Sequence, residues 1–120
     1  MGQENRRVQR LEIALSLSFK VVPTQQYVSL ATTVNISATG LCFVTKEKLH
    51  PGQDLIVQVT LSKFENVILP IQVVWVKEQF TFMQEEYAVG VKVKDSVDPD
   101  VAKFVKFFAN SFLAYSQKNK

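Results

Sequence analysis

The clearest pattern in the chain is an alternation of apolar and polar residues that begins near the N-terminus. From Leu11 to Val21 every odd position carries an apolar side chain, and most positions between them are polar. Successive side chains of a β-strand point to opposite faces, so this period of two predicts a strand with one buried face. The segment Pro23 to Gln26 ends the pattern.

Five further segments show strand patterns, separated by turn signals. Their apolar residues are Val28, Leu30, Val34 and Ile36 in the second strand, Leu41 to Val44 in the third, Leu55, Val57, Val59 and Leu61 in the fourth, Leu69, Ile71, Val73 and Trp75 in the fifth, and Tyr87, Val89, Val91 and Val93 in the last. The turn signals lie at 35–40, 50–53 and 62–66, with a hairpin tip at 84–86. Pro70 within the fifth strand indicates that the start of this strand lies at an edge or a bulge.

Six strands joined mostly by short turns, each with one apolar face, predict an antiparallel sheet that curls on itself. Closing the sheet removes its exposed edges, which are prone to pair with other chains. Because no strand alternates with a helix, the pattern disfavours a parallel α/β sheet. We therefore predict an all-β fold, a six-stranded antiparallel β-barrel over residues 11–94, preceded by a flexible arm at 1–10.

The period changes near the C-terminus. Asp98 can cap a helix, and Pro99 suits its first position. Aromatic residues then recur on one helical face, at Phe104, Phe108, Phe112 and Tyr115. These signals predict a C-terminal helix within 98–117. We expect the aromatic stripe to form a lid on the barrel, with a dimer or effector contact as the alternative.

Composition places the chain among ordinary globular proteins. It has 120 residues, 47% of them hydrophobic and 21% charged, which is enough for one core. The single cysteine, Cys42, lies in an apolar run, so we expect a buried, inert thiol and a reducing cytoplasm. No apolar run reaches the ~18 residues of a membrane span, and the N-terminus is too polar for a signal peptide. We expect a cytoplasmic protein without membrane insertion.

The sequence has none of the residue patterns that catalysis or metal binding requires. There is one histidine, His50, within a turn signal, and it has no cysteine or acidic partner at ligand spacing. Neither His50 nor Cys42 has a neighbour that would make a nucleophilic pair. Four glycines leave no room for a phosphate-binding loop. We predict a binding protein, with no enzyme activity, metal or cofactor.

The charge pattern points to an anionic ligand. The net charge is +3, and three arginines, Arg6, Arg7 and Arg10, lie in the polar N-terminal arm. Read alone, this is equally well a solvated basic terminus. The repeated use of arginine without lysine favours bidentate recognition of phosphate or of a guanine edge.

The Asn35–Gly40 turn offers the complementary groups. Asn and Ser beside a turn glycine are often no more than a hairpin. However, the Asn35 amide oxygen and the Ser37 hydroxyl can accept hydrogen bonds from the N1–H and N2–H donors of guanine. Gly40 allows a turn sharp enough to aim both side chains outward. With the arginine arm, this turn has groups that could bind the phosphates and base edges of a nucleotide such as one with guanine.

The pair Arg6-x-x-x-Arg10 and Asn35-x-Ser37-x-x-Gly40 resembles the RxxxR and (D/N)xSxxG motifs of PilZ domains, receptors for the bacterial second messenger cyclic di-GMP. The resemblance runs to about residue 93, through the Pro51-Gly52 turn and the Val89-Gly90-Val91 strand. It implies a six-stranded barrel whose arm folds over cyclic di-GMP and alters binding of a protein effector.

Two departures from the family pattern bear on the ligand. Position 35 carries Asn where many members have Asp, which removes a charged acceptor. Asn5 precedes the arginine motif where other members have Arg, a position associated with binding one ligand or an intercalated pair, so both stoichiometries stay open. Arg7 could add a phosphate contact.

Two other functions remain alternatives. One is a PilZ-like interaction module that binds a partner through the aromatic helix, independently of nucleotide, as a monomer or a weak dimer. The other is a barrel for single-stranded nucleic acid. We disfavour it because the aromatic residues lie mainly at inward or helical positions rather than on a basic platform.

Overall fold

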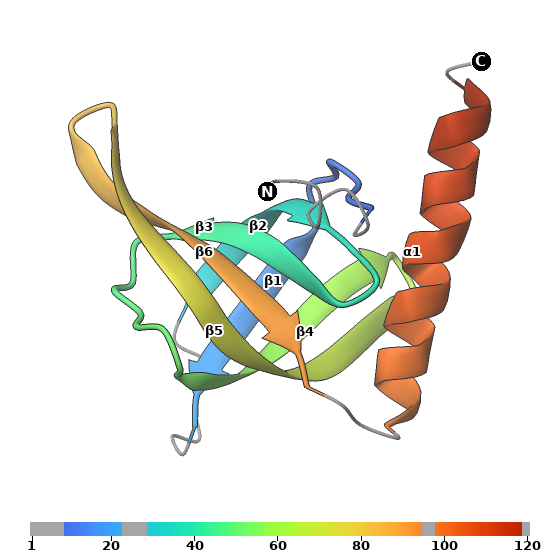
Figure 1. The fold of residues 1–120 in the computed structure, drawn as a ribbon, viewed down its shortest axis with the longest axis horizontal. Helices are drawn as coiled ribbons and strands as arrows, with labels where there is room; N and C mark the ends of the chain where they lie inside the picture. Colours follow the sequence, from blue (N-terminus) through green and yellow to red (C-terminus); the bar gives the residue numbers. More distant parts are fainter. Residues whose placement is uncertain (1–8, 23–28, 95–97, 119–120) are drawn as a thin grey trace, which may run out of the picture.

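The computed structural model describes residues 9–22, 29–94 and 98–118. The elements are β1 (Ser16–Val21), β2 (Ser29–Ile36), β3 (Gly40–Thr45), β4 (Asp54–Ser62), β5 (Glu65–Thr81), β6 (Gln84–Val93) and α1 (Pro99–Lys118). The strands form a closed barrel in the order β1-β2-β3-β6-β5-β4, and α1 stands beside it against β5 (Figure 1). The predicted fold class is confirmed. The proposed flexibility of the arm, with Arg6 and Arg7, concerns positions outside the described residues.

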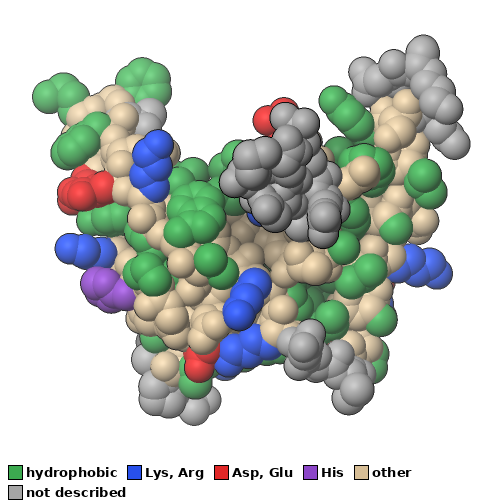
Figure 2. Space-filling model, in the orientation of Figure 1, with side chains coloured by type: hydrophobic (Ala, Val, Ile, Leu, Met, Phe, Trp, Pro, Cys, Tyr) green, Lys and Arg blue, Asp and Glu red, His purple; other side chains and the backbone are tan. Residues whose placement is uncertain are grey.

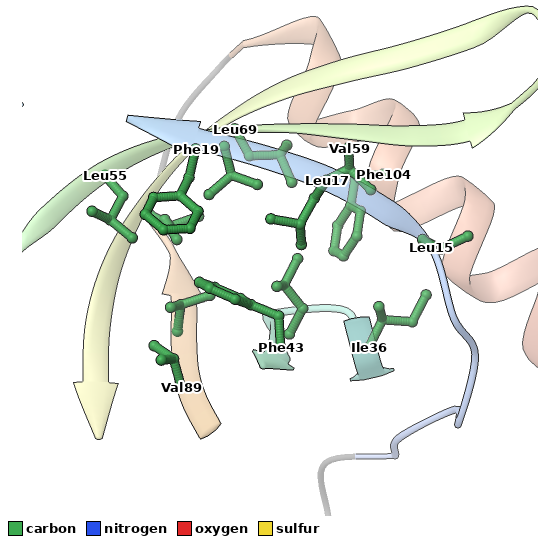
Figure 3. Close-up of a cluster of buried hydrophobic side chains, with 14 of the residues drawn as sticks. Leu15, Leu17, Phe19, Ile36, Phe43, Leu55, Val59, Leu69, Val89 and Phe104 are labelled. Carbon is green, nitrogen blue, oxygen red and sulfur yellow. The ribbon is translucent and has the colours of Figure 1, made fainter. Parts of the chain in front are cut away.

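The barrel is filled by apolar side chains from all of its strands and from α1. Phe19 and Phe43 are fully buried, with ring centroids 5.5 Å apart. Phe104 of α1 is also fully buried, and it reaches in beside Leu17 and Val59 (Figure 3). The first half of the aromatic stripe therefore covers the barrel, as predicted. Burying each of these aromatic side chains stabilises the fold by about 1.5–3 kcal/mol.

The first strand is shorter than its sequence pattern predicts. β1 begins at Ser16 rather than at Leu11, although Leu11 still exchanges two backbone hydrogen bonds with Ile36, at 2.8 and 2.9 Å. Between these points the Thr33 hydroxyl accepts a hydrogen bond from the Leu15 amide at 2.8 Å. A side chain therefore replaces one rung of the ladder, which interrupts the strand without exposing its apolar face.

Two bulges reverse the predicted direction of side chains. The β2–β3 register shifts between Thr33 and Asn35, and Val34, predicted to be buried, is 44% exposed. The β5–β6 register shifts between Val73 and Trp75, and Trp75 is 43% exposed although it was predicted to share a buried face with Val73. A bulge inserts one residue into one strand, so the alternation changes sides beyond it. Val28, which was predicted to lie on the buried face of the second strand, is outside the described residues.

The β5–β6 hairpin is longer than predicted. Its ladder continues to the pair Thr81 and Gln84, so the tip is Phe82–Met83 rather than 84–86. The two strands extend beyond the barrel as a ribbon (Figure 1). Towards the start of β5 the ladder with β6 begins only at Ile71, so Pro70 lies outside that ladder and is paired with Ile56 of β4. This agrees with the prediction that Pro70 lies near an edge, because proline has no N–H to donate to a second neighbouring strand.

The structure also bears on membranes. Within the described ranges, no helix has both the length and the apolar character that crossing a membrane would need.

Candidate functional site

The turn between β2 and β3 is shaped by its own serine. The Ser37 amide donates to the Gly40 carbonyl at 2.8 Å, and the Ser37 hydroxyl accepts from the Thr39 amide at 3.3 Å. The same hydroxyl donates to the Gly40 carbonyl at 3.4 Å. Ser37 is only 1% exposed. The prediction that the turn aims this side chain outward is therefore wrong for Ser37, whose hydroxyl points into the turn and fixes it.

Arg10 is held against the same turn. Its guanidinium Nη1 donates to the Asn35 Oδ1 at 3.0 Å. The next residue, Leu11, is tied to Ile36 by the two backbone hydrogen bonds described above, which places Arg10 directly beside Asn35. The Arg10 and Asn35 side chains remain accessible to a ligand, because Arg10 is exposed and Asn35 only partly buried.

The structure thus brings together four of the six predicted site residues: Arg10, Asn35, Ser37 and Gly40. Arg6 and Arg7 lie outside the described residues.

A hollow of about 130 Å³ opens beside this cluster, on the wall formed by β3, β6 and β5. Its lining residues are Arg10, Ser37, Thr39, Gly40, Leu41, Cys42, Val74, Trp75, Gly90, Val91 and Lys92. This wall faces the viewer in Figure 1. Pockets that enclose a drug-sized ligand are about 300–1,000 Å³, so this hollow can hold one part of a larger ligand.

Trp75 forms one side of the hollow because Gly90 leaves room for it. The two residues are paired across β5 and β6, and a Cβ on Gly90 would lie 2.2 Å from the Trp75 Nε1. The indole therefore lies against the β6 backbone while 43% of the residue stays exposed. A partly exposed aromatic plane beside a basic group can stack on a nucleic-acid base.

Sequence reasoning missed Trp75 as a site residue, and the sequence contains the signal that could have found it. The run Val73-Val74-Trp75-Val76 is continuously apolar, which strict alternation cannot place on one face. A glycine at position 90 in the neighbouring strand is a further indication of close approach.

The electrostatics of the hollow favour an anion. Arg10 and Lys92 both line it, and none of the described residues that line it is acidic. Burial raises the pKa of the Cys42 thiol, and the nearby Arg10 charge partly opposes this rise. Cys42 is therefore a buried, protonated thiol at neutral pH, as predicted. No group of three or more metal-binding side chains occurs among the described residues.

Comparison with known proteins identifies the family. The family model for the PilZ domain matches residues 4–109. The chain belongs to the PilZ domain family. The match covers the described strands and the first half of α1, and it confirms the resemblance drawn from the two motifs. No curated protein matches the sequence.

Solved structures show the same fold at low sequence identity. The inhibitor of motility MotI/DgrA of Bacillus subtilis has a TM-score of 0.68 and 14% identity, over 91% of this chain and 51% of that one. The PilZ domain of Escherichia coli YcgR with c-di-GMP has a TM-score of 0.70 and 12% identity, over 95% of both chains. The K. pneumonia MrkH–c-di-GMP complex has a TM-score of 0.70 and 14% identity, over 96% of this chain and 55% of that one. The present chain thus spans about half the length of MotI/DgrA and of MrkH.

Proposed function

We propose that this chain is a receptor for cyclic di-GMP, which binds between the N-terminal arm and the Asn35–Gly40 turn. The observation that carries the proposal is the Arg10–Asn35 hydrogen bond of 3.0 Å at the rim of a basic hollow with an aromatic side. The YcgR and MrkH structures, which contain c-di-GMP, support the choice of ligand. The proposal includes no catalytic step.

The Arg10–Asn35 bond keeps two ligand-binding groups paired until the nucleotide arrives. The Arg10 fork suits a phosphate or the N7 and O6 acceptors of guanine. When Arg10 turns to the ligand, the Asn35 oxygen is free to accept from the N1–H and N2–H donors of a guanine. The exchange replaces one hydrogen bond to a charged group by several, which favours the bound state.

The hollow limits how much of the ligand can enter. At about 130 Å³ it has room for one guanine base, which can stack on Trp75. The second base and the phosphates then lie outside it, where Arg6, Arg10 and Arg7 complete the site. One bound ligand and an intercalated pair both meet this condition.

Ordering of the arm is the proposed signal. Fixing about six arm residues costs roughly 6–12 kcal/mol, at about 1–2 kcal/mol each. Four or five hydrogen bonds to charged groups, at about 1.5–3 kcal/mol each, offset this cost, and stacking adds about 1–3 kcal/mol per base. We expect micromolar affinity that weakens as salt rises. The ordered arm then presents an altered surface to a protein effector.

Calorimetric titration with cyclic di-GMP tests the proposal. We expect saturable heat with cyclic di-GMP and none with cyclic di-AMP, which lacks the guanine donors that Asn35 would bind. Absence of heat at ligand concentrations on the order of tens of micromolar would refute the receptor function.

A second candidate function rests on α1. Leu113 and Tyr115, in its second half, are 59% and 56% exposed. A groove of about 300 Å³ separates this half from the segment at Leu11 and Ile13. The helix could bind a partner protein, or a second copy weakly, without nucleotide. Partner binding that survives loss of both Arg6 and Arg10 would favour this function over the receptor.

Replacing Ser37 with alanine is expected to lower both stability and affinity slightly. The variant loses the hydroxyl that accepts from the Thr39 amide and donates to the Gly40 carbonyl. Each neutral hydrogen bond contributes about 1 kcal/mol, so affinity should fall about fivefold. Calorimetry and urea unfolding measure the two effects. Ser62→Ala serves as the matched control, because the Ser62 hydroxyl likewise accepts from an amide two residues on, that of Phe64 at 3.4 Å, but Ser62 does not line the hollow.

Cys42 offers a chemical readout of the hollow. Because the pKa of its thiol is raised, little reactive thiolate exists at pH 7, and alkylation by iodoacetamide should be slow and should accelerate as pH rises. Bound cyclic di-GMP should slow it further by covering the hollow that Cys42 lines. Mass spectrometry of the alkylated fraction over time gives the rate. An equal rate with and without saturating ligand would place the ligand elsewhere.

A further inference from the structure

The far end of the β5–β6 ribbon carries an exposed apolar tip, which we define as Phe80, Phe82 and Met83. Their exposed fractions are 73%, 94% and 99%. Figure 2 shows hydrophobic side chains gathered at the end of this ribbon, at the upper left, with acidic side chains just below them. Single exposed apolar residues are common on proteins, but three together on a projecting ribbon are a typical mark of an interaction site.

The turn that displays the tip is strained. Phe82 and Met83 have φ values of 50° and 67°. Two-residue hairpin turns with positive φ at both positions strongly favour Asn-Gly, and a bulky side chain there is an outlier. Residues of this kind persist mainly where function requires them. Neither residue contributes to the buried core, so the fold itself gives no reason for this choice.

The base of the tip is acidic. Residues 77–86 hold three glutamates against one lysine. Glu85 pairs with Phe80 across the ribbon, and Glu78 lies two residues before Phe80 on the same face. The hydrogen bond from Glu85 and its repulsion raise the pKa of Glu78, while Lys48 acts in the opposite sense. Glu78 and Glu85 thus lie close enough to repel each other, and a basic partner group placed between them would relieve this repulsion.

We propose that this tip docks into a partner protein whose surface offers an apolar pocket with a rim of lysine or arginine. Phe82 and Met83 enter the pocket, and Glu78 and Glu85 pair with the rim. The charges decide against two other occupants. An anionic membrane repels the glutamates, and a tip-to-tip contact between two copies would place the same acidic groups against each other. This docking is independent of the proposed nucleotide binding.

The first experiment locates the partner in cells that produce the protein. A photoreactive phenylalanine analogue replaces Phe82 in one variant and Phe64 in another. Phe64 is the matched control, because it is 95% exposed but stands alone on the β4–β5 turn. We expect a discrete protein adduct from position 82 only. Equal adducts from both positions, or none from position 82, would overturn the proposal.

The second experiment measures the purified partner against designed variants. Phe82→Asn with Met83→Gly installs the favoured turn sequence, so it should raise the melting temperature while weakening partner binding about 30-fold or more. Glu78→Lys with Glu85→Lys should weaken it about tenfold. Phe64→Ser should leave it unchanged. Equal affinity in all variants would refute the docking.

Two further measurements test whether the tip binds a membrane or a second copy of the chain instead of a partner protein. Flotation with vesicles of phosphatidylcholine mixed with anionic phosphatidylglycerol, and analytical ultracentrifugation of the protein alone, compare the wild type with the Phe82→Asn, Met83→Gly variant. We expect no vesicle binding and no self-association that depends on the tip. Vesicle binding lost in the variant would identify a membrane element instead, and self-association lost in the variant would identify a second copy.

Discussion

Replacing Arg10 with alanine is expected to weaken cyclic di-GMP binding by at least about a hundredfold. Arg10 is the described arm residue that contacts the turn, at 3.0 Å from Asn35, and it also lines the hollow. In the bound state its fork would make two hydrogen bonds to charged or strongly polar ligand atoms. At about 1.5–3 kcal/mol each, their loss corresponds to a factor of about a hundred or more. Calorimetry measures the change directly.

Two controls make the Arg10 result specific. Arg10→Lys keeps the charge but loses the planar fork, so it should recover only part of the affinity. Lys103→Ala removes a positive charge on α1, away from the hollow lining, and should leave affinity unchanged. Because Arg10 is exposed, its loss should hardly change the melting temperature. Binding at wild-type strength by the Arg6→Ala, Arg10→Ala double variant would contradict the receptor proposal.

Most of the barrel could be predicted because one physical cause, burial of one strand face, dictates its pattern. The alternation at Leu17 and Phe19, and at Val57 and Val59, leads directly to fully or nearly fully buried side chains. The prediction was wrong where a bulge intervenes, because a bulge depends on the register of the partner strand. Trp75 is the consequential case, since its reversal moves an indole from the expected core to the wall of the hollow.

The hairpin tip was misplaced for a related reason. Sequence rules place a tight turn at residues that tolerate positive φ, and Phe82 and Met83 are among the least suited. The turn falls there because the β5–β6 ladder imposes it, pairing Thr81 with Gln84. Local preference is overridden by the sheet, so only the structure could reveal both the strained turn and the exposed tip.

One part of the candidate site could be predicted from the sequence and the other could not. The motifs found Arg10, Asn35, Ser37 and Gly40 because they lie close together in two short stretches that meet at the Leu11–Ile36 contact. The other side of the hollow comes from β5 and β6, which carry no motif. Its position follows from the strand order, in which β6 lies between β3 and β5.

Two glycine substitutions should separate the fold from the site. Gly40→Ala is expected to destabilise the protein by roughly 3 kcal/mol, the upper end of the usual cost of overpacking. A Cβ at this position would lie 2.2 Å from the Val91 carbonyl oxygen, and its other near neighbours are also backbone atoms of β6. Relief requires moving β3 away from β6, with which Gly40 is paired at Lys92. Urea unfolding measures the loss.

Gly90→Ala should have the opposite profile, a small change in stability and a clear loss of affinity. Its Cβ would meet the Trp75 indole at 2.2 Å, but that side chain is 43% exposed and can swing outward. Base stacking on an aromatic ring contributes about 1–3 kcal/mol, so affinity should fall about tenfold. Trp75→Ala should cause a similar loss. If Gly90 acts through Trp75, the double variant should bind no more weakly than Trp75→Ala alone, whereas additive losses would show that Gly90 affects the ligand by another route.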